Sequence, residues 1–283
     1  MEKTERQIDF DNSWVDKNAN VLSVSEALGM LSVPFDSDKV AQRTHDKHFF
    51  NKDSQYYQKT KEEILAMWES KGAVSRGYGK MLDNYIGTVL EGDETDMDMF
   101  KLDNDVDGDE RLANLCKSFD DFLSYAEYEK KDMKYVTREK MLYYKVDDFY
   151  IRGRFDALFY DEAKNKWIVI DWKSSGTIDK KPTQYTGNLL GPAKIFLDLN
   201  WYTYTLQTYL YKAALLAHYL PEGTKEDDVE VYIVNLPGKQ IEDNECWFDI
   251  NNAAFAYDKD IIDNIFRFSY KKSELLKKKK NVE

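Results

Sequence analysis

Two aspartates and a lysine lie in adjacent segments that are expected to pair as β-strands. Residues 149–159 (FYIRGRFDALF) and 167–173 (WIVIDWK) are rich in β-branched and aromatic side chains, and the polar sequence DEAKNK between them contains a turn. Because side chains two residues apart point to the same face of a strand, Asp171 and Lys173 share a face. Asp156 on the first strand can meet them, so the hairpin gathers three charged groups at one edge.

These residue types suit the hydrolysis of a phosphate ester. Two converging carboxylates bind a hard divalent cation such as Mg²⁺, which polarises a phosphoryl oxygen and activates water. A nearby ammonium group can orient that water or offset the charge that develops on the phosphate. The spacing alone leaves a second interpretation open, an ordinary hairpin with charges facing solvent, because Asp and Lys are common on exposed strand faces.

Three segments in chain order extend the pattern, namely GRFD, DWK and QTYLY. The four-residue spacing of Gln207 and Tyr211 places both side chains on one face of a helix. Together the three segments resemble the RecB-like exonuclease branch of the PD-(D/E)xK nuclease superfamily, in which a G-x-x-D strand, a D-x-K strand and a Q-x-x-x-Y helix form the active-site core. The resemblance covers roughly residues 135–215.

The resemblance implies a fold, a metal and a set of site residues. The fold is α/β (α+β), with a restriction-endonuclease-like mixed central sheet flanked by helices, and the cofactor is Mg²⁺ or Mn²⁺. The implied catalytic residues are Asp156, Asp171, Lys173, Gln207 and Tyr211. The implied metal ligands are Asp156, Asp171 and the backbone carbonyl of Trp172. Substrate contacts are expected from Arg154, Ser174, Gln207 and Tyr211, and Glu139 corresponds to a glutamate that precedes a strand in the family.

An upstream helix departs from the family pattern. The family carries a G-T-x-x-H-x-x-x-E helix, whose histidine is an additional metal ligand. The best alignment begins at Gly79 and places Asp83 at the histidine and Gly87 at the glutamate. Aspartate supplies the oxygen ligand that Mg²⁺ prefers, so Asp83 is a candidate ligand. A register shifted by two would place Met81 there, whose thioether does not bind Mg²⁺ usefully.

The primary hypothesis is a metal-dependent DNA nuclease, an exonuclease in DNA processing, replication or recombination. The sequence has no P-loop, so ATP-driven unwinding would come from a helicase or another replication or recombination partner. The competing hypothesis is a catalytically impaired nuclease-fold protein with a structural or DNA-contacting role in a phage particle or replication complex. The residues leave single-stranded and double-stranded DNA open as substrates.

Composition bounds the class of protein. The 283 residues are 42% hydrophobic, without an apolar run near the ~20 residues that cross a bilayer, and the charged N-terminus lacks the apolar core of a secretory signal. We therefore expect a cytoplasmic protein without membrane contact, in the host cytoplasm if it is viral. With two cysteines, one chain cannot hold a four-cysteine iron–sulfur cluster. Frequent Lys, Asn, Asp, Tyr and Ile suggest an AT-rich coding genome, such as that of a bacterium or phage.

Charge and periodicity suggest how the chain is organised. The net charge is −12, concentrated in an acidic insert at about residues 91–121. We expect a helical N-terminal portion over residues 1–134, a nuclease core over 135–275 and a basic, flexible tail over 276–283. The histidines of THDKH, His45 and His48, form either a metal pair or part of a surface loop.

Individual elements follow from the apolar spacing and the turn residues. Helices are expected at 22–32, 55–71, 78–91, 109–128, 200–219 and 252–275, and the segment 35–49 is expected to be a loop. Strands are expected at 139–147, 149–160, 166–173 and 229–236, with a short one at 245–250. Five aromatic residues near the hairpin and the Gln207 helix either stack on unpaired bases or pack in the core, namely Trp172, Tyr185, Trp201, Tyr202 and Tyr204.

Overall fold

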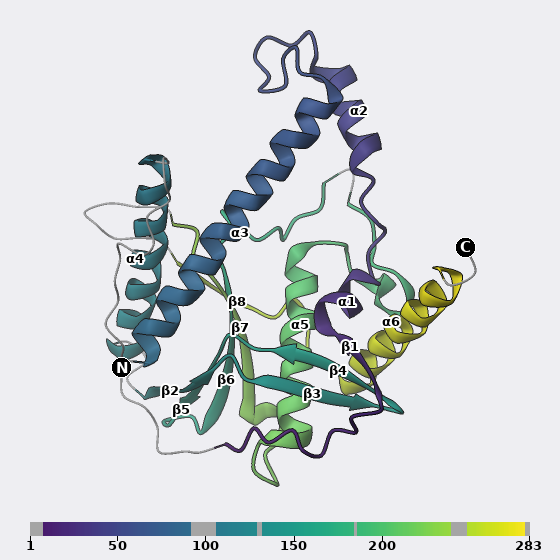
Figure 1. Ribbon diagram of the computed structural model, residues 1–283. Helices are drawn as coiled ribbons and strands as arrows, with labels where there is room; N and C mark the ends of the chain where they lie inside the picture. Colours follow the sequence, from purple (N-terminus) through teal and green to yellow (C-terminus); the bar gives the residue numbers. More distant parts are fainter. Residues whose placement is uncertain (1–7, 92–105, 129–131, 184–185, 239–247, 281–283) are drawn as a thin grey trace.

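The computed structural model describes residues 8–91, 106–128, 132–183, 186–238 and 248–280 (Figure 1). Its helices are α1 (Val24–Gly29), α2 (Ser37–His48), α3 (Lys61–Glu91), α4 (Val106–Tyr128), α5 (Asn200–Ala214) and α6 (Lys259–Lys280). Its strands are β1 (Asn20–Ser23), β2 (Met133–Arg138), β3 (Met141–Val146), β4 (Phe149–Arg154), β5 (Ala157–Asp161), β6 (Lys166–Lys173), β7 (Val229–Asn235) and β8 (Asp249–Asn252). None of the described helices is long and apolar enough to cross a membrane.

The strands form two mixed sheets. The larger sheet has the order β2-β5-β6-β7-β8, with β6 and β7 parallel and the other neighbours antiparallel. The smaller sheet has the order β1-β4-β3, with β1 parallel to β4. The parallel pair β6 and β7 requires a crossover, and α5 lies in that connection. The expected mixed α/β fold is confirmed, with its strands divided between two sheets.

Alternation along β6 separates the two faces of the larger sheet. Ile168, Ile170 and Trp172 belong to the core formed with α3 and α4, whereas Trp167 and Val169 belong to the core that includes α5. Because strand side chains alternate between faces, the odd-numbered residues of β6 point toward the α5 side. Asp171 and Lys173 therefore face α5 at the C-terminal end of β6.

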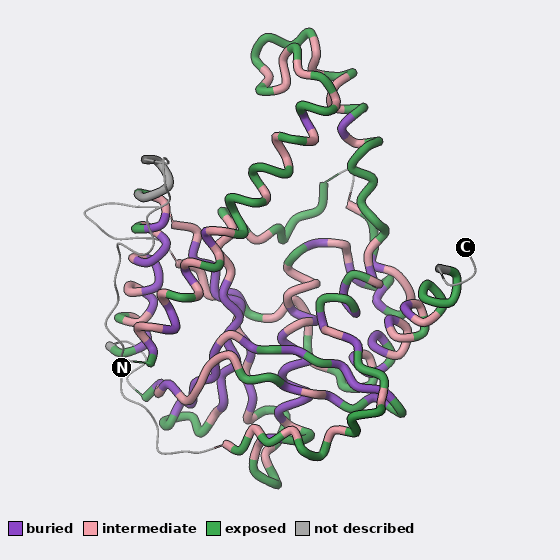
Figure 2. Tube along the Cα trace, in the orientation of Figure 1, coloured by how far each residue is buried: buried purple, intermediate pink, exposed green. Residues whose placement is uncertain are grey.

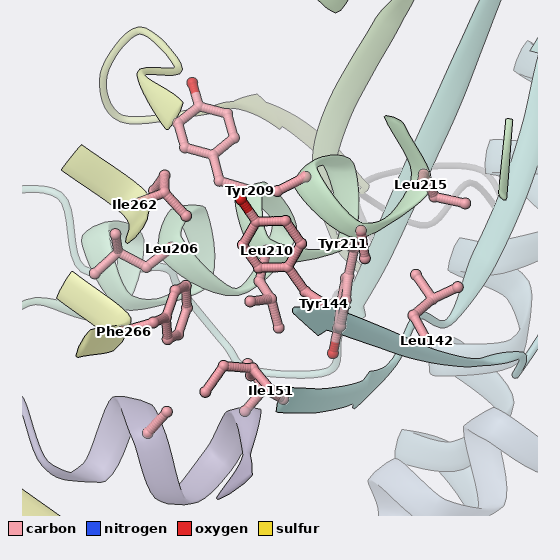
Figure 3. Packing of buried hydrophobic residues seen from close by; sticks show 14 of the residues in the cluster. Leu142, Tyr144, Ile151, Leu206, Tyr209, Leu210, Tyr211, Leu215, Ile262 and Phe266 are labelled. Carbon is pink, nitrogen blue, oxygen red and sulfur yellow. The ribbon is translucent and has the colours of Figure 1, made fainter. Parts of the chain in front are cut away.

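The core around α5 joins the smaller sheet to α6. Its apolar side chains pack between β3, β4 and the first half of α6 (Figure 3). The members labelled there include Leu142, Ile151, Leu206, Leu210, Tyr211, Ile262 and Phe266. Each fully buried aliphatic or aromatic side chain of this kind contributes about 1.5–3 kcal/mol. This packing fixes the helix that carries Gln207 and Tyr211.

The predicted strand 149–160 divides into two. β4 ends at Arg154 in the smaller sheet, and β5 begins at Ala157 in the larger one. The apolar run is continuous in the sequence, but the chain passes from one sheet to the other at Phe155 and Asp156. Asp156 therefore lies at a junction between sheets and not within a strand.

The N-terminal half of the chain differs most from expectation. Segment 35–49 contains α2, whose N-cap Asp36 accepts a hydrogen bond from the Lys39 N–H at 2.9 Å. Residues 55–60 of the helix expected at 55–71 are not helical, and the rest of it forms one helix of 31 residues, α3, with the helix expected at 78–91. Two glycines, Gly72 and Gly77, fall where a break was expected, but an interior glycine costs only about 1 kcal/mol relative to alanine, so the helix continues.

The first part of α3 and all of α2 extend away from the sheets (Figures 1 and 2). Most of this projection is exposed or half-buried in Figure 2, and the exposed fraction of the Phe50 side chain reaches 86%. The second part of α3, from Tyr78 onward, returns to the body and packs beside α4. α3 therefore connects the projection to the core of the nuclease-like region.

Other expected segments are only partly described. Residues 92–105 of the acidic insert lie outside the described residues, and 106–121 belong to α4. In the segment expected as a strand at 245–250, residues 245–247 lie outside the described residues, and β8 covers 249–252. α6 continues to Lys280, so the first part of the basic tail is helical, and 281–283 are not described.

Candidate active site

The two aspartates and the lysine of the hairpin lie together in the structure. The Oδ2 atom of Asp156 accepts a hydrogen bond from the Trp172 N–H at 2.7 Å, which holds the sheet junction against β6. The Nζ atom of Lys173 lies 2.5 Å from Oδ2 of Asp171, whose side chain is fully buried. The expected convergence of Asp156, Asp171 and Lys173 is present.

Burial makes this group of charges strongly interdependent. Burial first, and then the charge of Asp171, raise the pKa of Asp156 to about 8. Burial also raises the pKa of Asp171, against the effect of Lys173. Burial alone would lower the pKa of Lys173, but the two carboxylates raise it above its ordinary value. Two buried carboxylates beside a single ammonium group favour the binding of a cation.

The donor atoms fit a hard divalent cation. Oδ1 of Asp171 is buried and has no hydrogen-bond partner among the described residues, so it retains free lone pairs. No three His, Cys, Asp or Glu side chains in the described ranges are grouped closely enough to hold a metal by themselves. Mg²⁺ needs no such cage, since it is usually bound by one or two carboxylates and keeps several waters. Asp156, Asp171 and a backbone carbonyl match that requirement.

Glu139 is tied to the same junction through its backbone. Its φ of 54° is in the left-handed region, and its N–H points to the carbonyl oxygens of Phe155 and Asp156, at 3.1 and 3.3 Å. Burial, followed by the charge of Asp83, raises the pKa of its side chain. The Nε atom of Arg154 lies 2.6 Å from its Oε2 atom. This position makes Glu139 a stronger candidate for a site residue than the sequence alone did.

On α5, Gln207 and Tyr211 share a face as the spacing predicts. The Nε2 atom of Gln207 donates a hydrogen bond of 2.9 Å to the hydroxyl of Tyr211. Gln207 lines the cavity described below, whereas the Tyr211 ring is buried behind it against β4. A Cβ atom at Gly153 would lie 2.6 Å from this ring, so the glycine of GRFD leaves room for Tyr211. Tyr211 therefore supports Gln207 from the core.

Tyr204 contacts the ammonium group of Lys173. The Nζ atom lies 4.4 Å from the centroid of the Tyr204 ring, within cation–π range. Lys173 is thus held between the Asp171 carboxylate and an aromatic face. The sequence placed Tyr204 among several aromatics near the site, but nothing in its spacing separated it from the others. Tyr185, another of them, lies outside the described residues.

We expect the Tyr204 ring, and not its hydroxyl, to support Lys173. Tyr204→Phe should leave turnover near the wild-type value, because it keeps the ring face. Tyr204→Leu should lower turnover about fivefold to thirtyfold, the equivalent of the ~1–2 kcal/mol of a partly desolvated cation–π contact. Steady-state kinetics of the two variants make the comparison. Equal loss in both variants would contradict a role for the ring face.

The site opens into a cavity of about 280 Å³ between α3, α5 and the sheet junction. Its lining residues are Gly79, Leu82, Asp83, Ile86, Glu139, Arg154, Asp156, Asp171, Trp172, Lys173, Ser174 and Gln207. The predicted site residues Asp83, Arg154 and Ser174 therefore face the same space as the hairpin. Asp83 is also paired, since its Oδ1 atom accepts a hydrogen bond of 2.7 Å from Nη2 of Arg138.

One residue near the cavity was not recognised from the sequence. Arg138, one residue before Glu139, was not singled out, although a basic residue beside a candidate glutamate was the available signal.

The histidines of α2 do not line the cavity. Nδ1 of His45 lies 3.0 Å from Oδ1 of Asp46, and the His48 ring lies against Tyr56. The His45 contact lies at the surface of α2, whereas the Nδ1 atom of His48 is buried.

The comparison with protein families agrees with this geometry. The family model described as PD-(D/E)XK nuclease superfamily matches residues 83–278. No curated protein matches the chain. The family match covers more than half of the sequence and includes every cavity-lining residue except Gly79 and Leu82. The chain therefore belongs to the PD-(D/E)XK nuclease superfamily.

Proposed function

We propose that this protein is a metal-dependent DNA nuclease that hydrolyses phosphodiester bonds, acting as an exonuclease in DNA processing, replication or recombination. The observation that carries the proposal is the buried group of Asp156, Asp171 and Lys173 at the base of an open cavity. Membership of the superfamily supports a metal-dependent nuclease in general. The ordered GRFD, DWK and QTYLY segments support the RecB-like exonuclease branch.

The buried carboxylates would hold the metal. Asp156 and Asp171, with the backbone carbonyl of Trp172, would bind Mg²⁺ or Mn²⁺, and a bound cation of this kind acidifies water and stabilises charge on a phosphoryl group. Lys173 is held by Asp171 and Tyr204, and its ammonium group would lie beside the attacking water. Its fixed positive charge would stabilise the charge that develops on the phosphate.

Three polar side chains of the cavity wall are suited to binding the DNA strand. Arg154 is 59% exposed and pairs with Glu139, so its guanidinium can reach a phosphate without first leaving a buried position. Gln207 offers an amide that Tyr211 orients from behind. Ser174 follows Lys173 at the rim and offers a hydroxyl. The cavity therefore offers the cationic groups of Arg154 and Lys173 to a DNA strand, although the whole chain is acidic.

Cleavage of defined DNA substrates tests the proposal. Purified protein is incubated with linear duplex, closed circular and single-stranded DNA, each with Mg²⁺, with Mn²⁺ or with EDTA. We expect degradation of substrates with free ends, none of closed circles, and none in EDTA. Cleavage of closed circles would replace the exonuclease assignment by an endonuclease. An unwinding partner is expected for long duplexes, and a helicase added to the assay tests that part.

The same assay separates catalysis from a binding role. The position that aligns with the family's glutamate is Gly87, and the guanidinium of Arg138 occupies the space beside it. That departure favours the alternative of a catalytically impaired protein with a structural or DNA-contacting role in a phage particle or replication complex. DNA binding without cleavage under every metal condition would support this alternative and contradict the nuclease.

A further inference from the structure

We propose that Arg138 is a positioning residue, which fixes Asp83 and the adjacent turn of α3 in the wall of the cavity. Gly87, which has no Cβ atom, leaves the space beside α3 that the Arg138 guanidinium occupies. Nη2 of Arg138 donates to the Asp83 side chain at 2.7 Å and to the Asp83 backbone carbonyl at 3.1 Å. One guanidinium thus holds both the side chain and the backbone of a single cavity residue. The inference rests on the proposed nuclease function for its catalytic consequence.

Arg138 acts through Asp83 because it does not itself face the cavity. It is the last residue of β2, and its side chain is only 13% exposed, compared with 44% for the Asp83 side chain. Asp83 lines the cavity, and Arg138 is not among the lining residues. In the described part of the chain, Asp83 is the one ion-pair partner of Arg138. A largely buried guanidinium requires such a partner, so the pair holds β2 and α3 together.

Gly87 makes this arrangement sterically possible. It lies one helical turn after Asp83 and is buried. A Cβ atom there would lie 2.3 Å from Nη1 and 2.8 Å from Cζ of Arg138, closer than non-bonded atoms approach. The clash is with the end of a flexible side chain, so a larger residue would displace the guanidinium and leave the helix intact. Gly87→Ala therefore breaks the Asp83 contact without touching Asp83 or Arg138.

The pair also sets the charge of the cavity wall. Arg138 carries the positive charge that offsets Asp83, and Arg154 does the same for Glu139. Removing the Arg138 charge leaves Asp83 unpaired in the wall of the cavity that Asp156 and Asp171 also line. The cavity should then bind a cation more tightly while the α3 wall is held less firmly. This combination distinguishes positioning from collapse of the site, in which metal affinity and turnover would fall together.

The test is a double-mutant cycle with Arg138→Ala, Gly87→Ala and the double variant. Each single variant should lower the cleavage rate constant about tenfold or more, since small displacements of positioning groups are costly. The double variant should lie within about twofold of Arg138→Ala, because Gly87→Ala acts by displacing a side chain that is no longer there. Independent effects that multiply to about a hundredfold would overturn the proposal, as would wild-type rates in both single variants.

Two further variants serve as matched comparisons. Gly77→Ala lies in the same helix, and its added Cβ meets nothing within 4 Å, so cleavage should remain at the wild-type rate. Arg138→Lys keeps the charge but loses the guanidinium, whose Nη2 atom reaches both Asp83 acceptors while its Nη1 atom lies beside Gly87, so it should not restore the rate. Full activity of Arg138→Lys would overturn the positioning role and leave only a charge effect.

Two readouts do not depend on cleavage. Calorimetric titration with Mn²⁺ should give a dissociation constant for Arg138→Ala that is equal to or several-fold below the wild-type value, from the lost positive charge. In urea unfolding of the metal-free protein, Gly87→Ala should lower the midpoint in the wild-type background. It should raise the midpoint in the Arg138→Ala background, where the space is vacant and alanine favours the helix. The same shift in both backgrounds would overturn the proposal.

These readouts distinguish failure of the proposed nuclease function from failure of the positioning role of Arg138. If the wild-type protein cleaves no DNA with either metal, the proposed function fails, while the reversal in the unfolding midpoint still decides whether Gly87 and Arg138 are coupled. If the wild-type protein cleaves and the four proteins of the cycle cleave alike, the nuclease function stands and the positioning role of Arg138 is wrong.

Discussion

Asp156→Asn is expected to abolish metal-dependent cleavage, with a loss of about 10³-fold or more, and to leave the metal-free protein at least as stable as the wild type. The rate falls because a neutral amide does not replace a carboxylate as a metal ligand, and the metal supplies several kcal/mol of transition-state stabilisation. Stability is retained because the asparagine Oδ1 can still accept the hydrogen bond from the Trp172 N–H. The substitution also removes a buried carboxyl group whose ionisation is opposed by burial and by the charge of Asp171.

The measurements are the cleavage rate at saturating Mg²⁺, the Mn²⁺ affinity and the free energy of unfolding without metal. Asp161→Asn is a matched control, since Asp161 is also a buried aspartate of the β5–β6 hairpin but pairs with Lys164 at its other end. The control should cleave at the wild-type rate. Cleavage by Asp156→Asn within tenfold of the wild type, in a folded preparation, would contradict the metal-ligand assignment.

Lys173→Met is expected to lower turnover by about 10²–10³-fold while metal binding is kept. Methionine has nearly the length of lysine without its charge, so the change removes the ammonium group that is proposed to stabilise charge on the reacting phosphate. Lysine is not a metal ligand when protonated, and its removal frees Asp171, so the Mn²⁺ affinity should be unchanged or slightly higher. The metal-free protein should be destabilised, because the buried Asp171 carboxylate loses its ion-pair partner.

Rate, metal affinity and unfolding are measured on the same preparation. Lys212→Met is the control, since Lys212 is a buried lysine of α5 that lies over the Tyr257 ring, 4.8 Å from its centroid, and does not line the cavity that holds Lys173. Turnover of the control should equal that of the wild type. A parallel loss of Mn²⁺ affinity and rate in Lys173→Met would indicate a collapsed site and not the loss of a catalytic group.

Contacts fixed by local periodicity could be read from the sequence. The two-residue repeat of a strand places Asp171 and Lys173 on one face, and the four-residue spacing of a helix does the same for Gln207 and Tyr211. In the structure both pairs are in direct contact. The mixed α/β class followed from the same patterns, because apolar strand and helix periods are properties of each segment alone.

The boundaries of the strands and helices depend on tertiary packing, which the sequence pattern does not show. The run 149–160 has the composition of one strand, but pairing with β3 and then with β6 divides it at Asp156. The apolar spacing predicted separate helices at 55–71 and 78–91, yet α3 continues through the glycines between them because anchoring of its second half outweighs their small cost. In both places a weak local preference was overridden by tertiary contacts.

The sequence by itself brought Asp156 together with Asp171 and Lys173, since Asp156 directly precedes β5 and the other two residues lie on β6, which pairs with β5. Only the tertiary structure decided what surrounds them. Arg138 reaches Asp83 across 55 residues of sequence, and Tyr204 covers Lys173 from a helix in another part of the chain. Such contacts depend on the packing of α3 and α5 against the sheets, which no local period encodes. The reason for a glycine at position 87 is visible only in the structure, where the guanidinium of Arg138 fills the space that a Cβ atom would need.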